Sequence, residues 1–423
     1  MAPAVSSSRR LPFFYGHLLV IAGYIIMLVM YGTLYSFGVF LKPLLAEPGW
    51  TRTSLLGAYS LCFFLSGALA APAGWLTDRV GPAPVICASG IFLGVGYLLL
   101  SHASSVAAFF LWLGLIVGAG MSGGIAPVLS TVTRWYRARR GLMTGLVVAG
   151  VGSGTFVMPS VSSVLIAAFG WRVSFLLFGI VTGGAVAGLG LLFRREPRDM
   201  GLLPYGSQPG GANPNHNGPA RGLSLPEAFR TVEFWILIGL YASAGFFIQI
   251  ALVNTTIYAV ELGAPQFRAA ALLSVTGLGS IAGRLLGGFA SDRLGTRPVL
   301  VVATLMMAAQ FGLLLVSRGL PALFLFAGLF GITYGEILCA MPLLPAELFG
   351  LRRHGALLGV ITFASTLGGG TGPLAAGFLF ELFRNYNVVW SVCAAASLMA
   401  FILSLSTGKG RRRDTRIVRQ RGH

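Results

Sequence analysis

Charged side chains are scarce in this sequence, and acidic ones are the scarcest. Among 423 residues only 10% are charged, 12 are aspartate or glutamate, and 55% are hydrophobic. A water-soluble fold needs more polar surface than this to cover its apolar core. The composition therefore excludes an ordinary soluble domain.

Cysteine is almost absent, and reactive motifs are missing. The four cysteines fall inside apolar stretches without paired spacing, at Cys62, Cys87, Cys339 and Cys393. They read as small packing residues, so neither a disulfide framework nor a metal site is expected. No nucleophile, base and orienting group occur together in a recognisable catalytic motif. We therefore expect no enzyme activity and no cofactor.

What the sequence does have is a series of long apolar runs, each able to cross a hydrocarbon core of about 30 Å. We expect twelve spans, at 14–41, 54–76, 84–102, 107–132, 143–168, 173–193, 233–260, 268–291, 298–317, 321–348, 355–380 and 386–406. The expected fold class is an all-α polytopic membrane protein with twelve transmembrane helices.

Basic residues are distributed unevenly between the two sets of loops. With twelve spans, 23 lysines and arginines lie on the side of the termini, 6 lie on the opposite side, and one, Arg284, lies within a span. We expect a multi-pass protein of the cell inner (plasma) membrane, and the positive-inside rule then places both of its termini in the cytoplasm. Because topology explains most of the net charge of +18, nucleic-acid binding is not expected. The expected partner of the basic tail is the lipid bilayer.

A turn motif occurs twice at a fixed spacing. It reads GWLTDRVGPAP after the second span and GFASDRLGTRP after the eighth, so Asp78 and Arg79 match Asp292 and Arg293 at an offset of 214 residues. The same offset relates several other glycines, prolines and basic residues, which indicates two homologous six-helix halves. The expected parts are an N-terminal bundle over 1–193, a cytoplasmic linker over 194–232, a C-terminal bundle over 233–406 and a basic cytoplasmic tail over 407–423.

Arg284 is the one basic residue inside an apolar run. A guanidinium at the middle of a membrane helix costs at least about 2.5–3.5 kcal/mol, so such residues normally face a water-filled cavity or a partner charge. We interpret Arg284 as an anchor for an anionic substrate. The alternative is a structural ion pair that locks two helices together.

Glu336 is the only acidic residue near the middle of a span. Three interpretations are open. It is protonated at rest and carries the coupled proton, or it pairs with Arg284 until substrate displaces it, or it bonds to a neighbouring helix and has no part in transport.

The doubled Asp-Arg-x-Gly turn, the six-plus-six arrangement and the long middle loop resemble the major facilitator superfamily. The segments SFGVFLKPLLAEPGW and RWYRARRGLMTGL, together with Arg284, resemble more narrowly the monocarboxylate transporters and the related oxalate/formate exchangers. The resemblance covers nearly all of residues 14–406 and implies a six-plus-six pseudo-twofold fold that works by alternating access. One departure is that the basic pair usual after the first turn is missing.

The resemblance also implies roles for individual residues. In the proton-coupled branch one arginine of the eighth span binds the substrate carboxylate, and Arg284 matches it. The residue one turn earlier is often acidic in that branch, whereas here it is Ser280. Asn254, Ser280 and Phe363 fall at positions that line the cavity in the family, and three tyrosines inside the spans are further candidates for substrate binding. The candidate substrate-binding residues are Arg284, Ser280, Asn254, Phe363, Tyr31, Tyr35 and Tyr334.

A second set of residues is expected to act as gates. Arg134 and Glu347 end the fourth and tenth spans and look like the pair that closes the inner gate in related carriers. An unpaired arginine that reaches the membrane surface is the alternative for Arg134. The candidate gating residues are Arg134, Glu347, Asp78, Arg79, Asp292 and Arg293.

The expected function is secondary active transport of a lactate- or pyruvate-like monocarboxylate, coupled to a proton. Dicarboxylate exchangers also carry a lysine in the eleventh span, and this sequence has none there, so its single cation suits a monoanion. An oxalate/formate-type anion exchanger is the alternative, and a drug efflux carrier is less favoured. The sequence does not indicate whether the protein binds an accessory subunit.

Overall fold

A computed structural model describes residues 14–207, 222–316 and 319–407. The middle of the expected linker and nearly all of the expected basic tail lie outside these residues. The described chain is helical, and its β structure is limited to two isolated bridges.

Nine helical segments make up the first half. They are α1 (Tyr15–Tyr35), α2 (Phe37–Leu45), α3 (Arg52–Val80), α4 (Pro82–Ser101), α5 (Val106–Leu111), the π-helix η1 (Trp112–Val117), α6 (Gly118–Met121), α7 (Ile125–Trp135) and α8 (Arg140–Gly190). A 3-10 turn, η2 (Pro197–Met200), follows within the linker. The second half contains α9 (Leu225–Phe229), α10 (Val232–Glu261), α11 (Gln266–Leu294), α12 (Thr296–Val316), α13 (Leu320–Phe349), α14 (His354–Phe383) and α15 (Tyr386–Ser406).

The helices account for the twelve expected spans. Among the described residues, eleven helices are long and apolar enough to cross a membrane, and α8 is far longer than one crossing needs, with 51 residues. It breaks at Gly170, whose φ of 78° and ψ of 169° are not helical. Glycine adopts this conformation without a steric penalty, so α8 supplies both the fifth and the sixth span.

The turn motif has a clear local cause. Gly81 and Gly295 end α3 and α11 with φ values of 95° and 86°, which residues with a side chain rarely adopt. Pro82 then starts α4 at a position where its missing N–H costs nothing. The two glycines therefore fix the sharp connections at equivalent places in the two halves.

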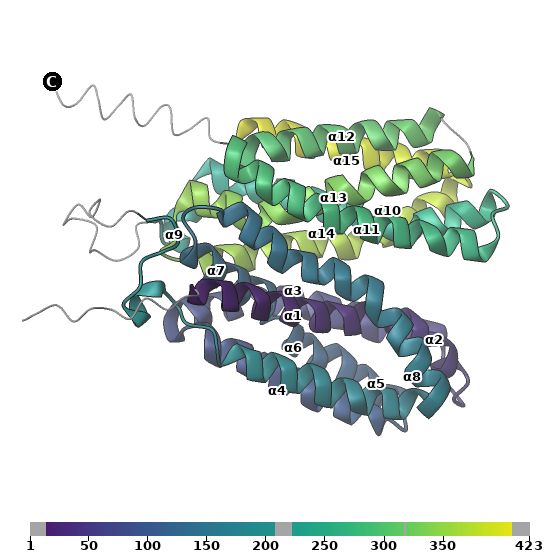
Figure 1. Ribbon diagram of the computed structural model, residues 1–423. Coiled ribbons are helices and arrows are strands. Elements are labelled where there is room, and N and C mark those ends of the chain that lie inside the picture. Colours follow the sequence, from purple (N-terminus) through teal and green to yellow (C-terminus); the bar gives the residue numbers. More distant parts are fainter. Residues whose placement is uncertain (1–13, 208–221, 317–318, 408–423) are drawn as a thin grey trace, which may run out of the picture.

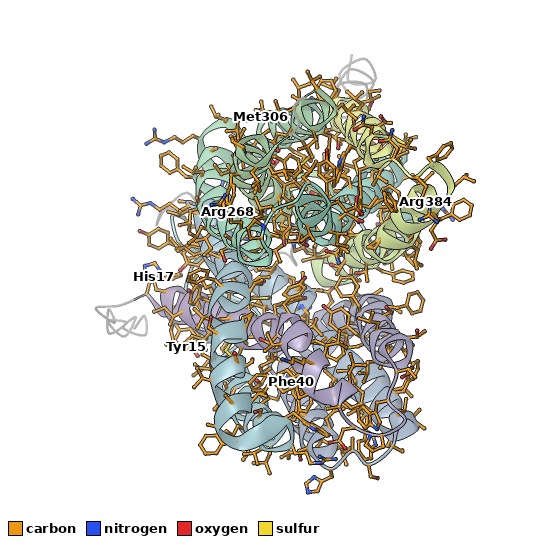
Figure 2. All side chains as sticks on the ribbon, turned by 90° about the vertical axis from the view of Figure 1, so that its right-hand side faces the viewer. Tyr15, His17, Phe40, Arg268, Met306 and Arg384 are labelled. Carbon is orange, nitrogen blue, oxygen red and sulfur yellow. The ribbon has the colours of Figure 1, made fainter. Side chains whose placement is uncertain are left out.

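The helices form two bundles joined by the linker, one built from α1–α8 and the other from α10–α15 (Figure 1). The bundles contact each other mainly through α3 against α14 and α8 against α11. Both contacts use glycine to bring the backbones together: a Cβ atom on Gly74 would lie 2.0 Å from the carbonyl oxygen of Gly355, and one on Gly141 would lie 2.2 Å from that of Gly288. These four glycines lie near the end that carries the linker, which we call the linker end. Figure 2 shows both bundles from the opposite end, with Phe40 in the first bundle and Arg384 in the second.

Candidate functional site

A cavity lies between the two bundles. Its volume is about 120 Å³, and its wall comes from α1, α3, α6, α7 and α8 of the first bundle and from α10, α13 and α14 of the second. A single water needs roughly 10–15 Å³ by a comparable measure, so the space can take a small organic molecule. The cavity, which both bundles line, is therefore the candidate binding site for a small molecule.

The cavity wall carries no charged side chain among the residues that the structure describes. Its polar groups are hydroxyls and one amide, set among methionine and aliphatic side chains. Tyr31, Tyr35 and Tyr334, three of the candidate substrate-binding residues, are among them. The rings of Tyr31 and Tyr35 lie 6.1 Å apart on one face of α1, as their four-residue spacing implies.

Arg284 lies behind this wall, on α11, with a side chain that is completely buried. Its Nη1 donates to the hydroxyl of Ser280 at 2.8 Å, and its Nη2 donates to the hydroxyl of Tyr334 at 3.3 Å. Its Nε is buried without a hydrogen-bond partner. Neither ion pair in the described chain involves Arg284, so the guanidinium is held by neutral groups alone.

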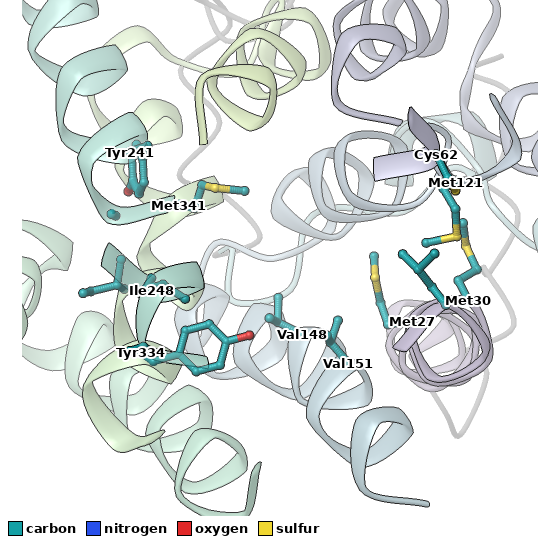
Figure 3. Close-up of a cluster of buried hydrophobic side chains, with 14 of the residues drawn as sticks. Met27, Met30, Cys62, Met121, Val148, Val151, Tyr241, Ile248, Tyr334 and Met341 are labelled. Carbon is teal, nitrogen blue, oxygen red and sulfur yellow. The ribbon is translucent and has the colours of Figure 1, made fainter. Parts of the chain in front are cut away.

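The first bundle covers the guanidinium from the other side. A Cβ atom on Gly152 of α8 would lie 2.5 Å from Nη1 of Arg284, so a larger residue at this position would force the guanidinium to shift. Tyr334 lines the cavity and has its ring centre 5.1 Å from the guanidinium carbon. Its hydroxyl points toward Val148 and Val151 of α8 (Figure 3). Tyr334 thus connects Arg284 with the cavity.

Three other predicted binding residues do not line the cavity. Asn254 is buried, and its amide donates to the carbonyl oxygen of Ile250 at 3.0 Å within the same helix. Phe363 packs edge-on against Phe64 of the first bundle, with ring centres 6.2 Å apart. Ser280 is also outside the wall and instead orients Arg284.

Glu336 lies on α13 away from the cavity. Tyr334 and Leu338 of that helix line the cavity, whereas Glu336 is half-buried against Gly287 of α11. The ion pairs of the described chain do not include a Glu336–Arg284 pair. Of the three interpretations, pairing with Arg284 is therefore not what this conformation shows.

The matched aspartates of the two turn motifs bind across the boundary between the bundles. Asp78 accepts from the backbone N–H groups of Gly355 and Ala356 at 3.3 and 2.9 Å, at the start of α14. Asp292 accepts from Gly141 and Leu142 at 2.6 and 2.8 Å, at the start of α8. Gly141 and Leu142 are the 214-residue equivalents of Gly355 and Ala356, so the repeat found in the sequence is a pair of equivalent contacts in space. Carboxylates at helix N-termini are favourable, and these two close the linker end.

The predicted pair of Arg134 and Glu347 is not formed. Arg134, which is buried, donates to Asp78 at 2.5 Å, and Glu347 accepts from the hydroxyl of Thr296 instead. Asp78 is nearer to Arg134 because both belong to the first bundle and meet where α3 and α7 end. Its carboxylate therefore binds a guanidinium and a helix N-terminus together.

The arginines of the two motifs face outward rather than toward the opposite bundle. Arg79 lies over the exposed ring of Trp75 at 4.1 Å, and Arg293 lies over that of Phe289 at 4.4 Å. The two arginines differ by 214 residues in position, and so do the two aromatic residues beneath them. No contact of either arginine supports the gating role that we predicted for it.

At the end opposite the linker, Glu47 fastens α2 to the second part of α8. Its carboxylate accepts from Arg172 at 2.7 Å and from the indole of Trp171 at 3.0 Å. The hydrogen bond from Arg172 is the main reason why the pKa of Glu47 lies below its ordinary value.

Sequence reasoning missed the neutral polar residues of the wall. They are Ser66, Ser122, Gln249, Thr362, Ser365 and Thr366. One signal was available, because Thr362, Ser365, Thr366 and Gly369 recur at helical spacing and all line the cavity from α14.

Comparison with known proteins gives a consistent result. A family model described as Major Facilitator Superfamily matches residues 23–289 and 255–422. Monocarboxylate transporter 13 of Rattus norvegicus is 27% identical over 392 residues, which cover 91% of this chain and 87% of that protein. Monocarboxylate transporter 11 of Mus musculus is 26% identical, with 92% and 86% covered.

The fold is also found in solved structures, among them the following two. The major facilitator superfamily transporter FucP in the outward conformation superposes with a TM-score of 0.70 at 17% identity, over 93% of this chain and 99% of its own. The human organic anion transporter MFSD10 gives a TM-score of 0.71 at 14% identity, over 92% and 99%.

Proposed function

This chain belongs to the major facilitator superfamily and is a multi-pass membrane transporter rather than an enzyme, and we propose that its cargo is a small monocarboxylate anion. The observation that carries the proposal is Arg284. It is a permanent charge in the membrane interior with no acidic partner among the residues that the structure describes, one side chain away from a cavity lined by both bundles. The similar proteins named monocarboxylate transporters support the same cargo.

The number of basic side chains near the cavity indicates how many negative charges the cargo carries. The described wall holds no basic side chain of its own, and Arg284 lies behind it. A dicarboxylate would leave one negative group without a counter-charge in a region of low dielectric, which is costly. A monoanion is balanced by Arg284 alone, so lactate- and pyruvate-like acids fit better than oxalate.

Tyr334 gives the carboxylate its first contact. Because its hydroxyl accepts from Nη2 of Arg284, its own proton is free to be donated into the cavity. A carboxylate bound there feels the charge of Arg284 through the phenol. Movement of Tyr334 aside would then allow the two-pronged bond that guanidinium and carboxylate groups favour.

Transport would follow from rocking of the two bundles. Asp78 and Asp292 hold the linker end closed, and the positive-inside rule places that end in the cytoplasm. We therefore interpret this conformation as outward-facing and expect both cross-bundle contacts to break on release. On this proposal the protein lies in the plasma membrane with both termini inside.

Proton-coupled symport is the first mode that we propose, because a co-transported proton makes the movement of an anion electroneutral. Anion exchange is the second candidate. It is favoured by the finding that no acidic side chain lines the described part of the cavity, and that Glu336 lies on the far side of α13.

Reconstituted vesicles can test both the cargo and the mode. We expect wild-type protein to accumulate labelled lactate when only an inward proton gradient is imposed. Uptake that instead requires preloaded internal anion, whatever the pH difference, would establish exchange. Uptake of neither lactate nor pyruvate under any gradient would contradict the monocarboxylate proposal.

Arg284→Lys tests the anchor itself. Lysine keeps the charge but cannot make the fork-shaped contact, and charged hydrogen bonds are worth about 1.5–3 kcal/mol each. We expect at least a tenfold rise in the lactate concentration for half-maximal uptake. Arg230→Lys, at an exposed site in the linker, is the matched control. Equal uptake by the two variants would remove Arg284 from the binding site.

A further inference from the structure

Most serine and threonine hydroxyls of the cavity wall have already used their protons. Ser66 donates to Phe63, Ser122 to Ala119, Thr362 to Leu358 and Thr366 to Thr362, each to a backbone carbonyl one turn earlier at 2.7–2.9 Å. A hydroxyl has a single proton to donate. These four residues can therefore accept from a cargo but cannot donate to one without breaking a bond.

Two wall residues of the second bundle are different. Within the described chain, neither the amide of Gln249 nor the hydroxyl of Ser365 has a hydrogen-bond partner, and both line the cavity. Among the described residues of that wall, Gln249 is the only one with a side-chain amide. The polar atoms of the two residues are not among the fully buried groups that lack a partner, so they are accessible from the cavity and free to bind a molecule that enters.

Gln249 and Ser365 belong to one patch. They stand on α10 and α14, which pack closely: a Cβ atom on Gly245 would lie 2.0 Å from the carbonyl oxygen of Ser365, and one on Gly369 would lie 3.0 Å from Cγ of Gln249. The groups that we assign to the carboxylate stand elsewhere, on α11 and α13. The cavity thus offers a second polar site in a different part of its wall.

We propose that Gln249, together with Ser365, recognises a hydroxyl or oxo group on the cargo, so that the carrier selects hydroxy- and oxo-substituted acids over plain carboxylic acids of the same length. The inference rests on the proposed function, which supplies the carboxylate at the Arg284 side. The amide suits both substituents, because it can donate to an oxo oxygen and accept from a hydroxyl. A site with unpaired polar groups rejects an analogue that cannot satisfy them.

The test compares lactate with propionate, which differ by one hydroxyl, in vesicles that contain wild-type protein or a variant. We expect wild-type protein to prefer lactate. Gln249→Met keeps a side chain of similar size without its hydrogen bonds and should lower lactate uptake efficiency roughly three- to tenfold, the range for one net hydrogen bond. Propionate uptake should change by less than about twofold, since propionate makes no such bond.

Two further variants make the result interpretable. Ser365→Ala removes one oxygen and should reduce lactate preference in the same direction even if Gln249→Met folds poorly. Ser243→Ala is the matched control, because Ser243 is on α10 and donates to Gly239 rather than lining the cavity. It should leave the lactate-to-propionate ratio unchanged.

The outcomes separate this inference from the proposed function. Equal losses of lactate and propionate uptake in the Gln249 and Ser365 variants would overturn the inference and leave monocarboxylate transport standing. A wild-type protein that does not distinguish the two acids would do the same. A wild-type protein that transports neither acid would overturn the proposed function and the inference with it.

Discussion

The two aspartate contacts at the linker end should differ in strength, although the sequence makes them look equivalent. Asp292 binds the two N–H groups that start α8, at 2.6 and 2.8 Å. Asp78 binds the start of α14 in the same way and also binds the buried guanidinium of Arg134. Replacing each aspartate by asparagine should therefore open the linker end to different extents.

The expected size follows from the bonds that are lost. Asparagine keeps one acceptor oxygen and loses the other together with the charge, which costs about 1 kcal/mol for Asp292 because its carboxylate is exposed to solvent. At 1.4 kcal/mol for each factor of ten, the open population should rise roughly fivefold. Asp78→Asn also leaves Arg134 buried without its counter-charge, a loss of about 3–5 kcal/mol in comparable pairs, so its effect should be at least tenfold larger again.

Cys339 is a native reporter for this opening. It is fully buried on α13, and its Sγ lies 3.8 Å from the carbonyl oxygen of Gly141, next to the Asp292 contact. With the other three cysteines replaced by alanine, the rate of Cys339 modification by a water-soluble thiol reagent should follow the open population. Asp199→Asn, an exposed carboxylate in the linker, is the control and should leave the rate unchanged.

Two results would refute this reasoning. An Asp292→Asn rate equal to that of Asp199→Asn would show that the helix N-terminus contact does not close the linker end. Equal rates for Asp78→Asn and Asp292→Asn would show that Arg134 adds nothing to the first contact.

Three further predictions follow from the geometry of single residues. Gly152→Ala places a methyl group 2.5 Å from Nη1 of Arg284, and because the guanidinium is the movable partner, lactate affinity should fall about ten- to a hundredfold while the unfolding temperature changes little. Tyr334→Phe keeps the ring but removes the hydroxyl that faces the cavity, so half-maximal uptake should need roughly three- to tenfold more lactate, and unchanged uptake would exclude contact with the phenol. Because Arg172 lowers the pKa of Glu47, ionised Glu47 stabilises the fold above the ordinary value of 4.5, and the stabilisation is lost as the pH falls through the lowered one. The unfolding temperature of the wild type should therefore exceed that of Glu47→Gln at pH 7, with a difference that shrinks in acid.

Much of the fold could be predicted from the sequence because its signals are local or repeated. Spans are long apolar runs, and the offset of 214 residues reflects contacts that Asp78 and Asp292 make in the same way. The predicted pairing of Arg134 with Glu347 was wrong, because the partner of Arg134 depends on which helix ends meet in space. Spacing along the chain does not reveal that Asp78, and not Glu347, is the neighbour.

The binding site was only partly predictable. A charge such as Arg284 stands out in an apolar run, whereas a neutral side chain lines a cavity or not according to the rotation of its helix. Adjacent residues of a helix point about 100° apart. Thr362 therefore faces the cavity while its neighbour Phe363 packs against Phe64, and Gln249 faces it while Asn254 bonds within its own helix.

The position of Arg284 joins the binding of cargo to the contact between the bundles. Its guanidinium belongs to the second bundle, but Gly152 of the first bundle covers it, so in this conformation the charge lies dry among neutral groups. Any movement of α8 away from α11 uncovers the charge, and any anion that binds it changes the free energy of that movement. Because such coupling is reciprocal, an anion that binds Arg284 more tightly when α8 has moved must also favour the movement. Gly152 and Arg284 therefore act together. The anion site needs Arg284 from the second bundle, and the closed contact over it needs Gly152 from the first.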